Sequence, residues 1–144
     1  MSRDSEESQM HETSVNQKIE KAIHEAVNDG TMILVFDKHG VIRYVNPSFL
    51  EVSQYDAEEI IEATTANFFT ADFYQIIKNT IEKNQKWTGE VIHKKKDGTR
   101  YWTDSSITPI VDKKQGHKYV LLQQDITKRK TYEHTLEELV FTDP

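Results

Sequence analysis

The chain has 144 residues and no cysteine, a length that suits one domain able to bury a core without disulfides or a structural metal. Its net charge of −6 argues against nucleic-acid binding, which requires a concentrated basic face to neutralise phosphates. No segment approaches the roughly 18 consecutive apolar residues of a membrane helix, and the first residues lack the apolar stretch of a secretory signal, so we expect a cytoplasmic location.

The N-terminal region is predicted to contain a short tail and one amphipathic helix. Residues 1–13 are polar, and we expect them to be disordered. Residues 14–29 have helical spacing, with Ser14 and Gln17 as a capping box. The apolar stripe of this helix is broader than a lone helix could keep soluble, so we expect it to form the contact of a homodimer. The stripe residues expected at this contact are Val15, Ile19, Ile23 and Val27.

A β-hairpin is expected next. The short apolar run "TMILVFD" occupies residues 31–37, and the run "VIRYV" occupies residues 41–45. They are joined through "DKHG", whose Asp37 and Gly40 suit a tight turn.

Helical patterns replace the strands from Asn46. Asn46 is expected to cap a helix over "PSFLEVS" that has Pro47 in its first turn. A second short helix is expected over "AEEII", where Asp56 and Glu59 are spaced to form a capping box. Thr70 is expected to cap a longer helix. The buried face of that helix is predicted to contain Phe73, Ile76, Ile77 and Ile81.

The apolar period returns to two after Trp87 and predicts three strands. These are "TGEVIHKKK", "TRYWTDSSITPIV" and "HKYVLLQQD", and Asp97-Gly98 predicts a two-residue turn between the first two. Two hairpins separated by a helical segment predict an α+β domain at residues 30–127, with an antiparallel sheet and its helices on one face. A further helix is expected over residues 128–144.

The sequence offers little for catalysis. Its six histidines are scattered, with no pair at metal-ligand spacing on one element. It has no glycine-rich phosphate cradle and no nucleophile elbow. Its carboxylates fall at helix caps and on exposed faces. We therefore predict no catalytic residue and no metal site, and we interpret the chain as a regulatory domain.

Several motifs follow one another in the second half of the chain: a tryptophan-glycine strand start in "KWTGEV", a "KKDG" hairpin, a "YW" strand, an "ITPI" exit and a closing "DIT". In order and spacing they resemble PAS sensor domains. The first half, "ILVFDKHGVIRYVNPSFLEVSQY", resembles the opening hairpin and helix of the same family. The resemblance covers residues 30–127 and implies a five-stranded antiparallel sheet that cups a small cavity against its helices. At "VSQYDAEE" the chain departs from the family, because many relatives have a glycine before the tyrosine.

Strand alternation identifies polar side chains that would face such a cavity. The residues predicted as ligand contacts are His93, Thr103, Ser105 and Gln123, together with Trp87. By resemblance, His93, Thr103 and Gln123 occupy positions that flavin-binding light sensors fill with asparagine, asparagine and glutamine. The alternative is that these polar groups bond only to one another or to water, and that Trp87 fills the core.

No cofactor is assigned from the sequence. "KWTGEV" and "KKKDGTRYW" are similar to flavin-binding PAS domains of aerotaxis and nitrogen-fixation regulators, which leaves a redox flavin open, although His93 replaces their asparagine. The absence of cysteine excludes cysteinyl-flavin photochemistry. Haem is disfavoured because relatives that bind it supply a histidine from the long helix, and "TADFYQIIKNTIEKN" has none.

The C-terminal segment suggests what the domain regulates. "LEELVFTDP" resembles the junction at which PAS linkers enter GGDEF domains, the diguanylate cyclases, and it favours that partner over a histidine kinase. We expect a ligand or redox change to shift Gln123, and Asp125, Ile126 and Thr127 to pass that shift to the C-terminal helix. The predicted function is therefore sensory input to cyclic di-GMP signalling. The alternative is a ligand-free module for protein interaction and dimerisation.

Overall fold

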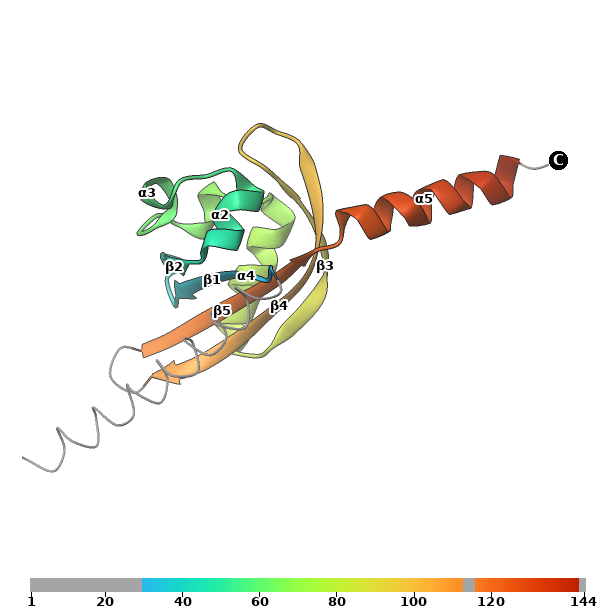
Figure 1. Cartoon of the computed structure of the whole chain (residues 1–144). Helices are drawn as coiled ribbons and strands as arrows, with labels where there is room; N and C mark the ends of the chain where they lie inside the picture. The colour runs from blue at the N-terminus through green and yellow to red at the C-terminus, as the bar shows by residue number, and fades with distance from the viewer. Residues whose placement is uncertain (1–29, 113–115, 143–144) are drawn as a thin grey trace, which may run out of the picture.

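The computed structural model describes residues 30–112 and 116–142. Five strands form one antiparallel sheet in the order β2-β1-β5-β4-β3 (Figure 1). The strands are β1 (Met32–Asp37), β2 (Ile42–Val45), β3 (Trp87–Lys94), β4 (Arg100–Asp112) and β5 (Gly116–Asp125). The tail and helix expected at residues 1–29, with the dimer contacts assigned to them, lie outside the described residues.

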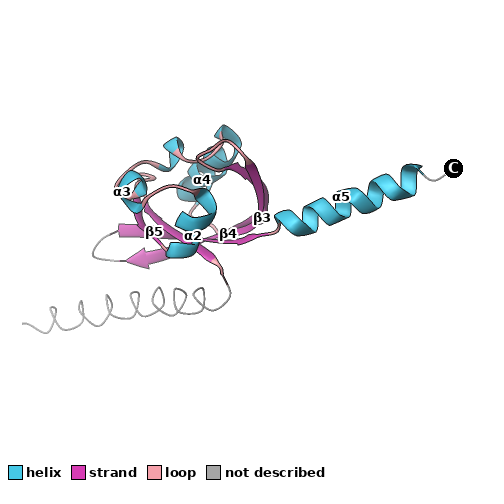
Figure 2. Ribbon diagram, turned by 45° about the horizontal axis from the view of Figure 1, so that its top comes forward, coloured by secondary structure: helices cyan, strands magenta, loops and turns pink. Residues whose placement is uncertain are grey.

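The short helices gather on one face of the curved sheet, as Figure 2 shows. They are α2 (Pro47–Ser53), α3 (Ala57–Ile60), the 3-10 helix η1 (Thr65–Asn67) and α4 (Ala71–Lys83). Helix α5 (Thr127–Thr142) instead extends away from the sheet. None of the helices in the described part of the chain is long and apolar enough to cross a membrane. The α+β prediction, with helices on one face of an antiparallel sheet, is confirmed.

Strand β1 is buried on both faces, which explains its continuous apolar run. Met32, Leu34 and Phe36 face the helices and join the main core. Ile33 and Val35 point to the opposite face, where they form a second apolar cluster with neighbouring strands. The main core continues across the sheet, because Phe36 stacks on Tyr119 of β5 with ring centroids 5.3 Å apart.

Polar caps begin the helices at the predicted positions. The Thr70 hydroxyl accepts a hydrogen bond from the Phe73 backbone N–H at 3.3 Å. The Glu59 carboxylate accepts one from the Asp56 backbone N–H at 3.3 Å. These contacts satisfy backbone groups that a helix end leaves without an internal partner.

Asn46 has a larger role than a helix cap. Its Oδ1 accepts hydrogen bonds from the Phe49 N–H at 3.0 Å and from the Ile33 N–H at 2.9 Å. Its Nδ2 donates to the Thr31 carbonyl at 2.8 Å. Asn46 is buried, so one amide side chain ties the start of α2 to β1 in the interior of the domain.

The helical region differs from the prediction in detail. The second short helix ends at Ile60 rather than Ile61, because Ile61 is extended and Glu62 adopts a positive φ of 68°. The 3-10 helix η1 was not predicted, since a single turn leaves no periodic signal. On α4, Ile76 and Ile81 are half-buried, whereas the other predicted residues of its core face are fully buried.

The turn between β3 and β4 is longer than the predicted two-residue turn. The Lys95 N–H donates to the Thr99 carbonyl at 2.8 Å, and this bond closes a loop of three residues. Gly98 takes φ +90°, a left-handed conformation that glycine adopts without strain. The Asp97 carboxylate accepts bonds from both the backbone N–H and the hydroxyl of Thr99, which stabilises the wider loop.

Candidate functional site

Four buried polar side chains meet on the helix-covered face of β3, β4 and β5. This polar cluster consists of His93, Thr103, Ser105 and Gln123, each with an exposed fraction of at most 2%. Ser105 lies directly opposite Gln123 in the β4–β5 ladder, and Thr103 lies opposite Val91 in the β3–β4 ladder. The alternation of side chains along each strand thus brings together the four polar residues that the sequence had placed on one face.

Gln123 contacts every other member of the polar cluster. Its Nε2 lies 2.8 Å from His93 Nε2, 3.1 Å from Ser105 Oγ and 3.5 Å from Thr103 Oγ1. Thr103 Oγ1 in turn lies 3.0 Å from His93 Nε2 and 2.7 Å from Ser105 Oγ. The cluster is therefore one connected network that joins three strands.

Two atoms of the polar cluster lack a partner. Because an amide nitrogen only donates, His93 Nε2 accepts from Gln123, and the neutral ring carries its proton on Nδ1. Nδ1 of His93 and Oε1 of Gln123 are buried without a hydrogen-bond partner among the described residues. Buried polar groups normally bond to protein or ordered water. The cluster therefore offers one unused donor and one unused acceptor.

Aromatic rings surround the imidazole of His93. The ring centroids of Phe73, Phe69 and Tyr101 lie 4.8, 5.3 and 5.4 Å from its own. Burial among these groups lowers the pKa of His93 to about 4, so the ring is neutral at pH 7. Burial also raises the pKa of Tyr101 well above its usual range, and the charge of Asp125 adds to the effect.

Trp87 lies beside the polar cluster but outside its network. Its ring meets Phe73 edge-on with centroids 5.8 Å apart, and Phe73 also contacts the His93 ring. The half-buried Trp87 also borders a surface groove of about 240 Å³ next to the end of α4. Gly89 allows this packing, because a Cβ at that position would come within 2.7 Å of the Trp87 ring. The tryptophan-glycine motif thus has a steric explanation.

The junction between β5 and α5 is bonded to β4. Asp125 Oδ1 accepts hydrogen bonds from the Thr127 N–H at 3.0 Å and from its hydroxyl at 2.5 Å. The Ile126 N–H donates to the Trp102 carbonyl at 2.9 Å, and the Trp102 N–H donates to Thr127 Oγ1 at 3.0 Å. The backbone of Trp102 therefore holds Ile126 and Thr127, and Asp125 is joined to them through its bonds to Thr127.

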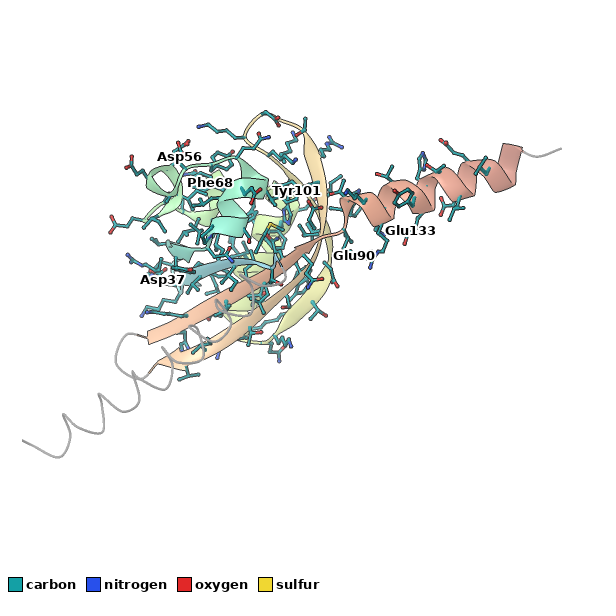
Figure 3. The ribbon with its side chains drawn as sticks, viewed as in Figure 1. Asp37, Asp56, Phe68, Glu90, Tyr101 and Glu133 are labelled. Carbon is teal, nitrogen blue, oxygen red and sulfur yellow. The ribbon has the colours of Figure 1, made fainter. Side chains whose placement is uncertain are left out.

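Ion pairs attach the first turn of α5 to β3. Glu90 Oε2 lies 2.9 Å from Arg129 Nη2, and Glu90 Oε1 lies 2.7 Å from Lys130 Nζ. The bond from Lys130 lowers the pKa of Glu90. Lys130 Nζ also lies 5.2 Å from the centre of the Trp102 ring. In Figure 3, Glu90 lies on the sheet next to the base of α5, and Glu133 lies further along the helix.

Sequence reasoning missed part of the surroundings of His93. Phe69 comes from the segment between η1 and α4, where no period marks a buried side chain. The adjacent pair Phe68-Phe69 before the cap Thr70 was the available signal, since two aromatic residues in a short polar segment indicate burial. The ion pairs of Glu90 also escaped notice, because their partners are about forty positions away in the chain.

The sheet buries the polar cluster on its helix-covered face and continues from β5 into the exposed helix α5. The chain belongs to the PAS domain family, whose family model matches residues 28–128. Domains of this family are sensory, regulatory modules of signalling proteins.

Two regulatory proteins match part of the chain. The chain is 28% identical over 110 residues to proteins named nitrogen fixation regulatory protein in Klebsiella oxytoca and Klebsiella pneumoniae. Each match covers 72% of this chain but only 22% of the relative, so the chain spans about a fifth of their length.

Solved structures share the fold. The PAS domain of a protein from Colwellia psychrerythraea is 27% identical, with a TM-score of 0.62 over 76% of this chain and 98% of that one. An RNA-binding Light-Oxygen-Voltage receptor is 21% identical, with a TM-score of 0.67 over 87% of this chain and 37% of that one. At that identity the second likeness concerns the fold alone.

Proposed function

We propose that this PAS domain is the sensory input module of a bacterial signalling protein and that it binds a small molecule at the polar cluster. The observation that carries the proposal is the pair of buried atoms His93 Nδ1 and Gln123 Oε1, which have no hydrogen-bond partner in the part of the chain that the structure describes. A ligand that both accepts and donates a hydrogen bond would satisfy the two atoms, within a wall of aromatic side chains that favours burial of its apolar part.

The ligand we propose is smaller than a flavin. The rings of Phe69 and Phe73 already contact the His93 ring, with centroids 5.3 and 4.8 Å away. A three-ring isoalloxazine would have to displace them, so these residues do not fit a flavin as they stand. Haem would have to displace the same rings for its iron to reach the imidazole of His93.

The signal would leave the polar cluster through β5. A ligand that bonds Gln123 Oε1 turns the amide and so alters the bonds of Nε2 to His93 and Ser105. Asp125 follows Gln123 by two residues on the same strand, and it orients Thr127 at the start of α5. In this scheme a change at Gln123 repositions α5 relative to Trp102.

We propose a diguanylate cyclase as the output, with signalling in the cytoplasm. The support is the resemblance of "LEELVFTDP" to the junction before GGDEF domains. An assay of cyclic di-GMP synthesis by the full-length protein tests the proposed output, and we expect synthesis. Autophosphorylation on histidine in the same assay would instead assign the domain to a histidine kinase, and the regulatory name of the Klebsiella relatives is compatible with either output.

Native mass spectrometry of the gently purified chain tests ligand binding. We expect a stoichiometric small molecule on the wild type and on Gln124→Leu, and its loss from Gln123→Leu. Gln124 is the matched control because it is the next residue and is exposed. Repeated absence of any bound molecule would overturn the sensory proposal and favour the interaction module. A flavin spectrum in the extract would overturn the claim of a smaller ligand.

A further inference from the structure

A surface groove lies where the end of α4 meets the start of β3. It has a volume of about 240 Å³, and the half-buried side chains of Ile76 and Trp87 form its apolar part. None of the four residues of the polar cluster is among the described residues that line it, so the groove is a separate place on the molecule. Pockets for drug-sized molecules measure about 300–1,000 Å³, and this groove therefore suits a smaller ligand.

Two lysines make the groove positive. Lys83 lies in the last turn of α4, and Lys86 directly precedes β3. Neither ammonium group has an ion-pair partner in the described part of the chain. No carboxylate is among the described residues that line the groove. In a chain whose net charge is −6, the groove thus concentrates positive charge, which attracts a small anion.

The dipole of α4 accounts for only one of these lysines. A cation in the last turn of a helix is favoured by the free carbonyl groups there, and this explains Lys83. The helix ends at Asn84, which takes a left-handed φ of 52°, and Lys86 lies two residues beyond it. Two ammonium groups on one groove repel each other, so an anion between them would turn a repulsion into two attractions.

Amide side chains add hydrogen-bond donors to the groove. Asn79 Oδ1 accepts a bond from Gln75 Nε2 at 3.0 Å, which leaves Nδ2 of Asn79 free to donate. The exposed amide of Gln85 also lines the groove. Carboxylate oxygens accept from amide and ammonium donors alike, so these groups match a carboxylate.

The ring of Trp87 gives the groove a fixed apolar surface. It meets Phe73 with centroids 5.8 Å apart and packs over Gly89, where a Cβ would come within 2.7 Å of it. The Tyr119 hydroxyl donates to Asn84 Oδ1 at 3.1 Å and so attaches the end of α4 to β5. The groove is therefore held in place before a ligand arrives, which lowers the cost of binding. A ligand ring can pack on the indole edge-on or offset.

We propose that this groove binds a small aromatic carboxylate, with its carboxylate between Lys83 and Lys86 and its ring on Trp87. The inference rests on the groove alone. It requires neither a ligand at the polar cluster nor the proposed diguanylate cyclase.

Titration of the complete chain with phenylacetate, followed by NMR, tests binding. This probe has one ring and one carboxylate, and we expect a Kd of about 0.1–1 mM. The expected shifts are in the indole N–H of Trp87 and in the backbone N–H groups of Gln85 and Lys86. Phenylacetamide, which has the same shape without the charge, and acetate, which lacks the ring, should each bind at least about fivefold more weakly. Equal affinity for phenylacetate and phenylacetamide, or no saturable shift up to about 10 mM phenylacetate, would overturn the proposal.

Removal of charge tests where the probe binds. The double variant Lys83→Gln, Lys86→Gln should raise the Kd for phenylacetate about tenfold. Lys78→Gln is the matched control, because Lys78 is exposed on the same helix and is not among the residues that line the groove. All three lysines are exposed, so these changes should leave the circular dichroism spectrum unaltered. A double variant that binds phenylacetate as tightly as Lys78→Gln does would overturn the proposal.

The two binding proposals fail separately. If the mass spectrum shows no bound molecule while phenylacetate still binds at Lys83 and Lys86, only the sensory proposal is lost. If the chain retains a bound molecule but the lysine variants bind phenylacetate like the wild type, only the groove proposal is lost.

Discussion

Replacing Asn46 with alanine is expected to lower the free energy of unfolding by about 3 kcal/mol. The substitution removes the acceptor of two backbone N–H groups, those of Ile33 and Phe49, both of which belong to buried residues. It also leaves the Thr31 carbonyl without its amide donor. Each buried donor left unpaired costs about 1–3 kcal/mol, so the loss exceeds that of an ordinary helix cap. Urea denaturation followed by circular dichroism measures the change.

Two matched variants separate the contributions of Asn46. Asn46→Ser keeps a short acceptor that can cap α2 at Phe49 but does not replace the longer amide at Ile33, so we expect an intermediate loss. Asn67→Ala alters an exposed asparagine and should change stability by less than about 0.5 kcal/mol. If Asn46→Ala behaves like Asn67→Ala, the amide does not tie α2 to β1 in solution.

Acidification is expected to destabilise the domain through His93. The pKa of this ring is about 4 in the folded chain because of burial, against about 6.5 for an unperturbed histidine. The unfolded chain therefore binds the proton more tightly than the folded chain does. The contribution of the neutral His93 ring to the free energy of unfolding is fully present above about pH 6.5. It is lost at about 1.4 kcal/mol per pH unit as the pH falls toward 4, to a total of about 3 kcal/mol.

The comparison of wild type with His93→Asn isolates this effect. Asparagine keeps hydrogen-bonding groups near Gln123 and Thr103 but does not titrate, so the difference between the two stability curves should grow from pH 7 to pH 4. Titration of the His93 ring by NMR in the wild type gives the folded pKa directly. A midpoint near 6.5 in that titration would show that the ring is hydrated.

Much of the fold was predictable because local chemistry determines it. Asn46 and Thr70 cap helices wherever a short acceptor precedes a helical pattern. The members of the polar cluster were predictable as a set, because alternation along β3, β4 and β5 decides which side chains face the helices. What alternation cannot give is the pairing of individual atoms. The free Nδ1 of His93 follows from where Gln123 Nε2 lies, and that depends on the ladder register.

Other features could not be predicted from local patterns. The three-residue loop between β3 and β4 is stabilised by the Asp97 carboxylate, which accepts hydrogen bonds from the backbone N–H and the hydroxyl of Thr99. The ring contacts of Phe73 with both Trp87 and His93 depend on how α4 packs on the sheet, and Trp87 stays a predicted ligand contact. A contact between residues two positions apart thus stabilises the loop, whereas long-range packing determines the contacts of Phe73.

The coupling from the polar cluster to α5 is tested most directly by hydrogen–deuterium exchange of two neighbouring variants. Gln123→Leu should speed exchange of the backbone N–H groups of Trp102, Ile126 and Thr127 by about tenfold, equivalent to about 1.4 kcal/mol of local stability. Gln124→Leu, on the exposed side of β5, should leave them at wild-type rates. Equal exchange in the two variants would contradict transmission through Gln123.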